Sequence, residues 1–296
     1  MPLNATDQAE GLRRMLGRQN PRVITLVSGG KGTGKTTAAL NLSTALAAGG
    51  RSVLLLDENH GGLNVAAMLG ARTTVDLNDA IRGGRMLEQC LLPGPEGLML
   101  LPAGRGVQSL AGIDDAGKAR LGEGFARIGA TLDFIVVDTA PGAASRLLPL
   151  AHPDQESILV AGADASRQTE AYGMVKLLQR DLNRRRLSLL ISMVATEAEG
   201  QLAFRNIAAV AQRYLKSEVN HLGSVARERR ADDAVRAGRP LVEMFPHAPA
   251  SAQLRSIARQ VLGWPGPAET GGDMEHFVRR LILGSRLRVG GSHVAA

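Results

Sequence analysis

The sequence has few of the residues that would place it in several common classes of protein. Cys90 is the only cysteine among 296 residues, so an internal disulfide and a cysteine metal cluster are both excluded. No run approaches the roughly 20 apolar residues of a transmembrane helix, and residues 1–15 carry acids where a secretory signal would be apolar. Aromatic residues make up 3% of the chain, and no helix-turn-helix pattern is present, so we do not expect nucleic-acid binding. A reducing, cytoplasmic location is the expectation.

Lysine is also scarce, and its placement is informative. The chain has a net charge of +7, of which the terminal segments 1–22 and 273–296 carry +2 each. Only five lysines occur, and Lys31 and Lys35 lie in one glycine-rich loop. Hydrophobic residues at 44% and charged residues at 21% are ordinary for a globular protein with a sizeable core.

Apolar runs alternate with helical patterns through most of the chain. Strands are expected at 23–27, 53–56, 98–101, 134–137, 158–160 and 187–191, and helices at 36–48, 168–182, 201–215 and 249–262. This alternation predicts an α/β fold with a mostly parallel, doubly wound sheet flanked by helices. The expected organisation is an N-terminal arm (1–21), a P-loop domain (22–263), a Pro/Gly linker (264–272) and a tail helix (273–289).

The segment 28–37, SGGKGTGKTT, contains the pattern GxxxxGK[ST] between an expected strand and an expected helix. Glycines let backbone N–H groups wrap around phosphates, and the helix N-terminus adds positive potential. Lys35 is expected to reach the β- and γ-phosphates, and the Thr36 hydroxyl to ligate Mg²⁺. A glycine-rich turn without a ligand is the alternative, which the strand–loop–helix context disfavours. The expected nucleotide-binding residues of the loop are Gly29, Gly30, Gly32, Thr33, Gly34, Lys35, Thr36 and Thr37.

Two aspartates follow expected strands. Asp57 ends the run VLLLD and Asp138 ends FIVVD, about a hundred residues after the loop. A lone aspartate at a strand end is often only a cap. The combination with the phosphate loop predicts that Asp57 and Asp138, with Thr36, hold Mg²⁺.

The order of these segments resembles the MinD/ParA family of deviant P-loop ATPases. The similar pieces are SGGKGTGKTTAALNLSTALAAGGRSVLLLD, ENHGGLNVAAMLG, DFIVVDTAPG and ADASRQTEAYGMVKLL, and the similarity covers nearly all of 22–263. The resemblance implies ATP with Mg²⁺ as cofactor and an ATP-dependent homodimer.

Within the family, the chain resembles the FlhG branch, MinD-like regulators of flagellar number and placement. The similarity lies in the arm motif DQAEGLR and in segments 199–223 and 230–259. It implies that the arm stimulates an FlhF-type GTPase and that flagellar basal-body (C-ring) proteins are further partners. A disordered extension is the alternative for the arm. The implied partner-binding residues are Asp7, Gln8, Ala9, Leu12 and Arg13.

The chain departs from the family pattern at positions that bear on hydrolysis. The family's signature lysine, which crosses a dimer interface to the partner's ATP, is replaced by Gly30, and the spare lysine is Lys31 one step later. The family aspartate that positions or activates water, two residues after Asp57, is Asn59. Loss of a general base typically lowers a rate by ~10²–10⁴. We therefore predict nucleotide binding with slow or absent hydrolysis, with Lys35, Lys31 and Asn59 at the catalytic positions.

Two positions on the adenine side also depart from the family. Its asparagine after the strand 187–191 is Ser192, and its later proline is Ala226. A hydroxyl has one donor where an amide has two donors and an acceptor. Ser192 is thus the expected contact to the nucleotide base, and we expect the site to be less selective between bases.

The tail 273–289, DMEHFVRRLILGSRLRV, predicts an amphipathic helix with Phe277, Val278, Leu281 and Ile282 on one face. MinD-like proteins carry a C-terminal membrane-targeting helix of this kind, which implies peripheral attachment to the inner face of the cell membrane. A helix docked on its own core, or on a protein partner, is the alternative.

Two other functions remain open at this point. The first is a ParA/MinD-type ATPase that positions DNA, division machinery or other cargo, and Gly30 and Asn59 argue against it. The second is a scaffold that has lost nucleotide binding, against which the intact GKTT argues.

Overall fold

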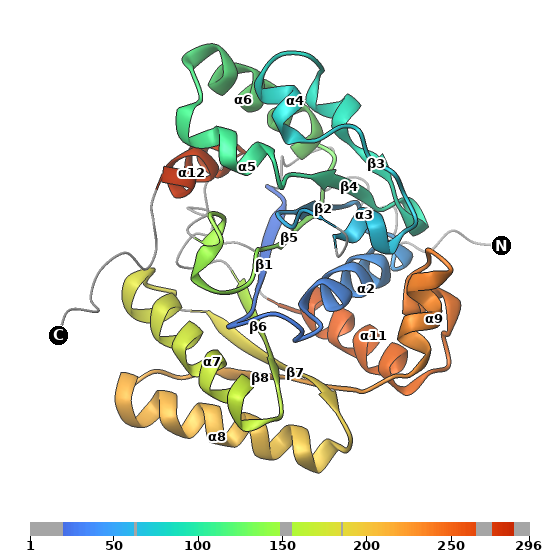
Figure 1. The fold of residues 1–296 in the computed structure, drawn as a ribbon, viewed down its shortest axis with the longest axis vertical. Helices are drawn as coiled ribbons and strands as arrows, with labels where there is room; N and C mark the ends of the chain where they lie inside the picture. The colour runs from blue at the N-terminus through green and yellow to red at the C-terminus, as the bar shows by residue number, and fades with distance from the viewer. Residues whose placement is uncertain (1–19, 62–63, 149–155, 185, 265–273, 287–296) are drawn as a thin grey trace, which may run out of the picture.

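The computed structural model describes residues 20–61, 64–148, 156–184, 186–264 and 274–286 (Figure 1). The partner-binding residues expected in the arm, Asp7 to Arg13, lie outside the described residues, as does nearly all of the expected linker.

A single eight-stranded sheet forms the centre of the described part of the chain, in the order β3-β4-β2-β5-β1-β6-β7-β8. The strand pairs are parallel except β3–β4, which confirms the predicted fold class. Each residue of β2 and β5 is buried, as continuous apolar runs in a sheet covered on both faces require. The strands are β1 (Arg22–Val27), β2 (Val53–Asp57), β3 (Leu92–Pro93), β4 (Met99–Pro102), β5 (Phe134–Asp138), β6 (Glu156–Gly162), β7 (Leu187–Val194) and β8 (Asn220–Ala226).

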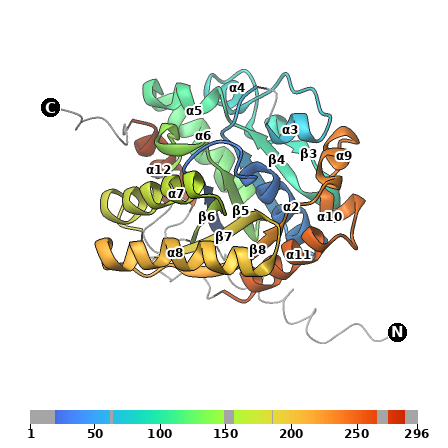
Figure 2. The same cartoon turned by 60° about the horizontal axis from the view of Figure 1, so that its bottom comes forward.

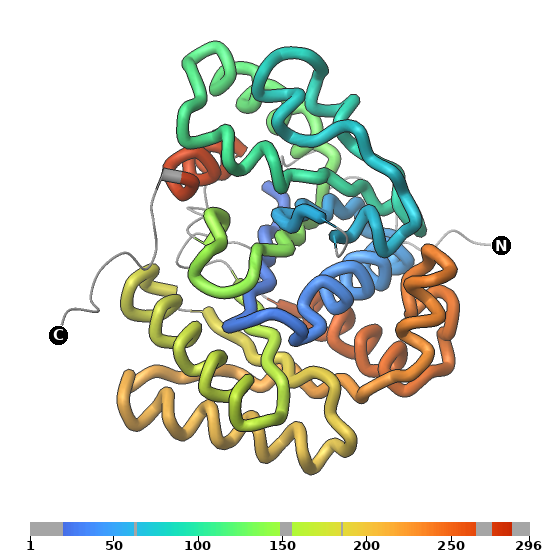
Figure 3. Tube along the Cα trace, viewed as in Figure 1, coloured from blue at the N-terminus to red at the C-terminus, as the bar shows by residue number. Residues whose placement is uncertain are grey.

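Helices cover both faces of the sheet. On one face α2 (Lys35–Ala48) and α11 (Pro249–Leu262), far apart in the sequence, run side by side (Figure 3). On the other face α6 (Asp115–Gly129) packs near one edge, and α7 (Ala165–Lys176) and α8 (Glu197–Leu215) near the other (Figure 2). The shorter helices are α3 (Val65–Met68), α4 (Leu77–Ile81), α5 (Gly106–Ser109), α9 (Arg230–Arg236) and α10 (Leu241–Met244).

Two expected helices begin earlier than the apolar spacing predicts. Asp164 accepts a hydrogen bond from Arg167 N and caps α7, which ends in a π-helical turn at Leu177–Asp181. Thr196 caps α8 in the same way through Glu199 N. In both helices the polar first turn carries no apolar periodicity, so only the cap marks the true start.

The tail helix α12 (Met274–Arg286) packs on the body of the protein. It lies against α6 and the short turn Leu110–Gly112, and Phe277 meets Phe125 edge to face with ring centroids 5.3 Å apart. The residues expected to meet a membrane are buried instead: Phe277, Val278, Leu281 and Ile282. The expected apolar face is present, but the protein's own core covers it, which is the alternative that the pattern left open. No helix among the described residues is long and apolar enough to cross a membrane.

Candidate functional site

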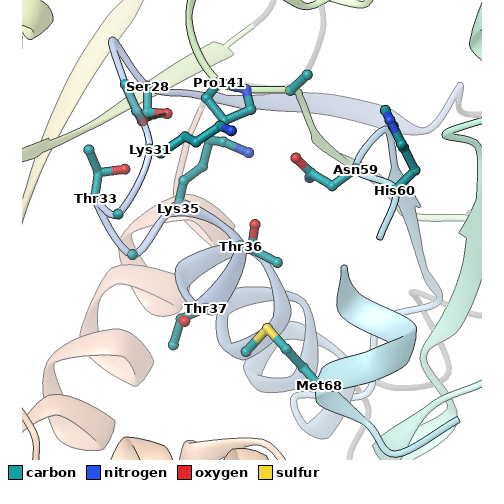
Figure 4. A pocket seen from close by; sticks show the side chains of 14 residues that line it. Ser28, Lys31, Thr33, Lys35, Thr36, Thr37, Asn59, His60, Met68 and Pro141 are labelled. Carbon is teal, nitrogen blue, oxygen red and sulfur yellow. Dashed lines mark hydrogen bonds between the residues drawn. The ribbon is translucent and has the colours of Figure 1, made fainter. Parts of the chain in front are cut away.

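The β1–α2 loop lies at the carboxyl edge of the parallel strands, where α/β proteins bind ligands. Gly32 and Gly34 adopt left-handed backbone conformations, with φ of 71° and 78°, that disfavour side chains. Gly34 precedes the first turn of α2, so the helix N-terminus opens toward the loop. A cavity of about 440 Å³ lies there (Figure 4). Its lining includes Ser28, Gly30, Lys31, Gly32, Thr33, Gly34, Lys35, Thr36, Thr37, Asn59, His60, Met68, Ala140 and Pro141.

Lys35 is buried and already held in place. Its side chain is 4% exposed, and Nζ donates to Asp138 Oδ1 and to the carbonyl of Thr139. Figure 4 shows the amino groups of Lys31 and Lys35 pointing toward the same space, which Asn59 faces from the opposite side. Lys31 is exposed. Both predicted lysines therefore line the cavity, and the ammonium of Lys35 neutralises a strand-end carboxylate.

The two predicted magnesium carboxylates are neighbours in the sheet. Asp57 and Asp138 are register partners in β2 and β5. Burial raises the pKa of Asp57 to about 7, and the nearby charge of Asp138 adds to the rise. Asn59 Nδ2 donates to Asp57 Oδ1 and to Asp138 Oδ2, each at 2.8 Å. The amide thus relieves a repulsion that an aspartate at position 59 would increase.

These residues suit a hydrated cation better than a fully coordinated one. Among the described residues no group of three or more His, Cys, Asp or Glu side chains converges as a metal site. Both oxygens of Asp57 accept N–H bonds, Oδ1 from Asn59 and Oδ2 from Val65 N at 2.7 Å. The repulsion between Asp57 and Asp138 nevertheless favours a nearby cation. The donor set therefore fits a hydrated Mg²⁺, which Thr36, Asp57 and Asp138 would hold.

A second cavity, of about 500 Å³, also includes Gly34 and Thr37 in its lining and so adjoins the first. Ser192, near the end of β7, lines it and donates its hydroxyl proton to the carbonyl of Thr33. The backbone N–H of Ala226 is also engaged, by Gln253 Oε1 at 2.8 Å. Ser192 therefore braces the phosphate loop, and its single donor is not free for a base.

The departure at Gly30 has a steric partner on α7. A Cβ atom at residue 30 would lie 2.3 Å from the Glu170 carboxylate, and one at Gly29 would lie 2.3 Å from the Glu170 carbonyl. The loop is thus packed directly against α7, and glycine at both positions allows this approach.

Sequence reasoning missed Glu58, which lies between Asp57 and Asn59. Its side chain is 6% exposed and accepts hydrogen bonds from Ala140 N, Arg146 N and the Ser145 hydroxyl. Burial raises the pKa of its carboxyl, and these three donors act in the opposite direction. An acidic residue next to a strand-end aspartate is the only sequence signal, because its partners lie more than 80 residues away.

Comparison with known proteins agrees with this geometry. The CobQ/CobB/MinD/ParA nucleotide binding domain model matches residues 24–241. The antiactivator FleN of Pseudomonas aeruginosa is 35% identical over 270 residues, which are 91% of this chain and 96% of FleN. The flagellum site-determining protein YlxH of Helicobacter pylori is 27% identical and covers 81% of each chain.

Solved structures show the same fold. A chain of the MinC:MinD cell division protein complex of Aquifex aeolicus superposes with a TM-score of 0.65 and 26% identity, covering 85% of this chain and 100% of that one. The residues that the family model matches, 24–241, include the phosphate loop, both strand-end aspartates and Ser192. The chain therefore belongs to the CobQ/CobB/MinD/ParA nucleotide-binding family.

Proposed function

We propose that this protein is an FlhG-like regulator of flagellar number or placement that binds Mg-ATP and acts as a nucleotide-dependent dimer switch. The observation that carries the proposal is the intact phosphate loop, which opens into two adjoining cavities. The flagellar role is supported by similarity to antiactivator FleN and to flagellum site-determining protein YlxH.

In this proposal the larger cavity takes the base and the other takes the phosphates. Backbone N–H groups of the loop and the N-terminus of α2 bind the phosphate oxygens. Lys35 exchanges its bond to Asp138 for the phosphates. Mg²⁺ would be held by Thr36, with Asp57 and Asp138 behind it, and it would neutralise phosphate charge. Calorimetry with Mg-ATP tests this step, and absence of binding by the full-length protein would contradict it.

Intrinsic hydrolysis is expected to be slow. Asn59 donates to two carboxylates and has no basic atom that accepts a proton from water. Gly30 supplies no signature lysine, and Lys31 is the residue nearest to that role. Steady-state phosphate release at the rate of ordinary MinD proteins would contradict this part. If Lys31 acts across a dimer, Lys31→Ala should weaken ATP-dependent dimerisation.

The output of the switch is proposed to be stimulation of an FlhF-type GTPase by the arm. The test compares GTP turnover by the cognate partner with the full-length protein and with a form lacking residues 1–20. Stimulation that disappears on truncation supports the arm as the output. No stimulation by either form would instead favour a ParA/MinD-type cargo-positioning ATPase.

Membrane attachment, the remaining part of the proposal, requires α12 to leave α6. Its buried large side chains, such as Phe277 and Leu281, are worth about 1.5–3 kcal/mol each in the core and a similar amount in lipid. The free energy lost when α12 leaves α6 is therefore nearly regained when the same side chains enter the lipid. Two tails on one dimer would favour the membrane further. Unchanged liposome co-sedimentation after deletion of residues 273–296 would refute it.

A further inference from the structure

Glu58 joins two strand ends that border the phosphate cavity. Its carboxylate accepts from Ala140 N at 2.6 Å, from Arg146 N at 2.7 Å and from the Ser145 hydroxyl, while its own N–H donates to Asp138 O at 3.0 Å. The side chain thus holds both ends of the segment 140–146, which follows β5, to the end of β2. A charged acceptor with several donors makes stronger hydrogen bonds than neutral groups do.

The segment 140–146 forms part of the cavity wall and contacts the phosphate loop. Ala140 and Pro141 line the cavity, as Figure 4 shows for Pro141. Gly142 N donates to Ser28 O at 2.9 Å. Gly142 has φ of 66°, and a Cβ atom there would lie 3.1 Å from the carbonyl of Gly29. Glu58 therefore holds the segment 140–146 on one side. On its other side, the position of the segment determines how it fits against the phosphate loop.

The wall that Glu58 supports borders the phosphate cavity and not the proposed base cavity. The two cavities meet at Gly34 and Thr37, whereas Asn59, Ala140 and Pro141 line only the phosphate cavity. A nucleotide that extends from one cavity to the other would bring its terminal phosphate toward these three residues. A diphosphate lacks the terminal phosphate, so it would not extend as far toward these three residues.

We propose that Glu58 is a positioning residue that fixes the segment 140–146 against the phosphate loop and thereby sets the preference of the site for a nucleoside triphosphate over a diphosphate. The inference rests on the proposed nucleotide binding. Glu58 acts through this segment and not as a base, because its carboxylate is buried and faces the donors of Ala140, Ser145 and Arg146.

The first measurement is hydrogen–deuterium exchange in the nucleotide-free full-length protein. Glu58→Ala leaves the N–H groups of Ala140 and Arg146 without their acceptor, so peptides within 138–148 should exchange about tenfold faster. Glu156→Ala is the matched control and should leave exchange at 138–148 unchanged, because Glu156 is a half-buried glutamate at the amino end of β6 whose pKa is also raised by burial. Exchange at 138–148 that is unchanged in Glu58→Ala would overturn the proposal.

The second measurement is calorimetry with a non-hydrolysable ATP analogue and with ADP, both with Mg²⁺. Glu58→Ala should weaken the triphosphate about tenfold and the diphosphate by no more than about twofold. Equal losses for both ligands would overturn the triphosphate assignment. If Glu58→Ala does not fold, Ser145→Ala removes one of the three bonds and should change exchange and the affinity ratio in the same directions, by less.

The two measurements separate this proposal from the proposed function. If the unmodified protein binds neither nucleotide, the proposed function fails, and the role in setting nucleotide preference fails with it. The exchange experiment needs no ligand, so it still decides whether Glu58 holds the segment 140–146.

Discussion

Replacing Asp57 by asparagine should make the protein's stability less sensitive to pH. Burial and the charge of Asp138 raise the pKa of Asp57 from 3.8 to about 7. The folded protein therefore retains a proton that the unfolded chain releases, and the free energy of unfolding falls as pH rises from about 4 to about 7. About three pKa units at 1.36 kcal/mol each set a ceiling of about 4 kcal/mol for this loss. Above about pH 7 both states are ionised, and Asp57 adds no further slope.

The slope, and not the absolute stability, is the quantity to measure. An amide at position 57 cannot accept all the N–H bonds that the ionised carboxylate accepts, so the substitution also changes the absolute stability. Urea unfolding of both proteins without nucleotide or Mg²⁺ should show the unmodified protein losing up to about 2 kcal/mol more than the variant between about pH 5 and pH 6.5. Glu58, whose raised pKa has its causes in burial and in groups other than Asp57, is present in both proteins and cancels in the difference. If the free energy of unfolding changed equally with pH in the two proteins, the reasoning would be refuted.

Two further predictions concern packing. Phe277→Ala should lower the free energy of unfolding by about 3–5 kcal/mol in urea titrations, because it leaves a cavity at a buried site. Leu283→Ala is the control on the same helix. Its side chain is 52% exposed, so the free energy of unfolding should change by less than about 0.5 kcal/mol. Equal effects would show that α12 does not dock in solution. Gly29→Ala should cost more stability in thermal melts than Gly30→Ala, by about 1–3 kcal/mol. The new methyl group meets the Glu170 backbone in the first case and the end of its exposed side chain in the second. The reverse order would contradict the observed packing of the loop on α7.

The central strands were predictable because burial on both faces leaves a continuous apolar run, as in VLLLD of β2 and FIVVD of β5. The edge strand β8 was not, because its sequence NHLGSVA contains no such run and Gly223 accompanies an irregular register with β7. Local periodicity reports burial of the segment itself, so strands exposed on one side or interrupted by a bulge give a weak signal.

The candidate site divides in the same way. The loop and the two aspartates follow from local order along the chain, since parallel strands bring their carboxyl ends to one edge. The contacts that surround the loop and the two aspartates do not follow from local order. Glu170 against Gly30 and Ala140 against Glu58 are contacts between segments more than 80 residues apart, and no spacing rule encodes them. The amphipathic tail is an intermediate case, because its pattern predicts an apolar face and not what covers that face.

The charge balance at the strand ends explains why an asparagine suits position 59. Asp57, Glu58 and Asp138 are all buried at these strand ends, and Lys35 is the buried basic residue that pairs with one of them, Asp138. The other buried basic residue in the described part of the chain, Arg184, donates elsewhere. An aspartate at position 59 would place a fourth carboxylate where the amide now donates to two of the three. With Glu58 present, Asn59 is therefore the substitution that keeps the cluster tolerable without a bound cation. The amide has no basic atom to accept a proton from water, so the arrangement that keeps this cluster stable without a ligand supports the slow hydrolysis proposed above.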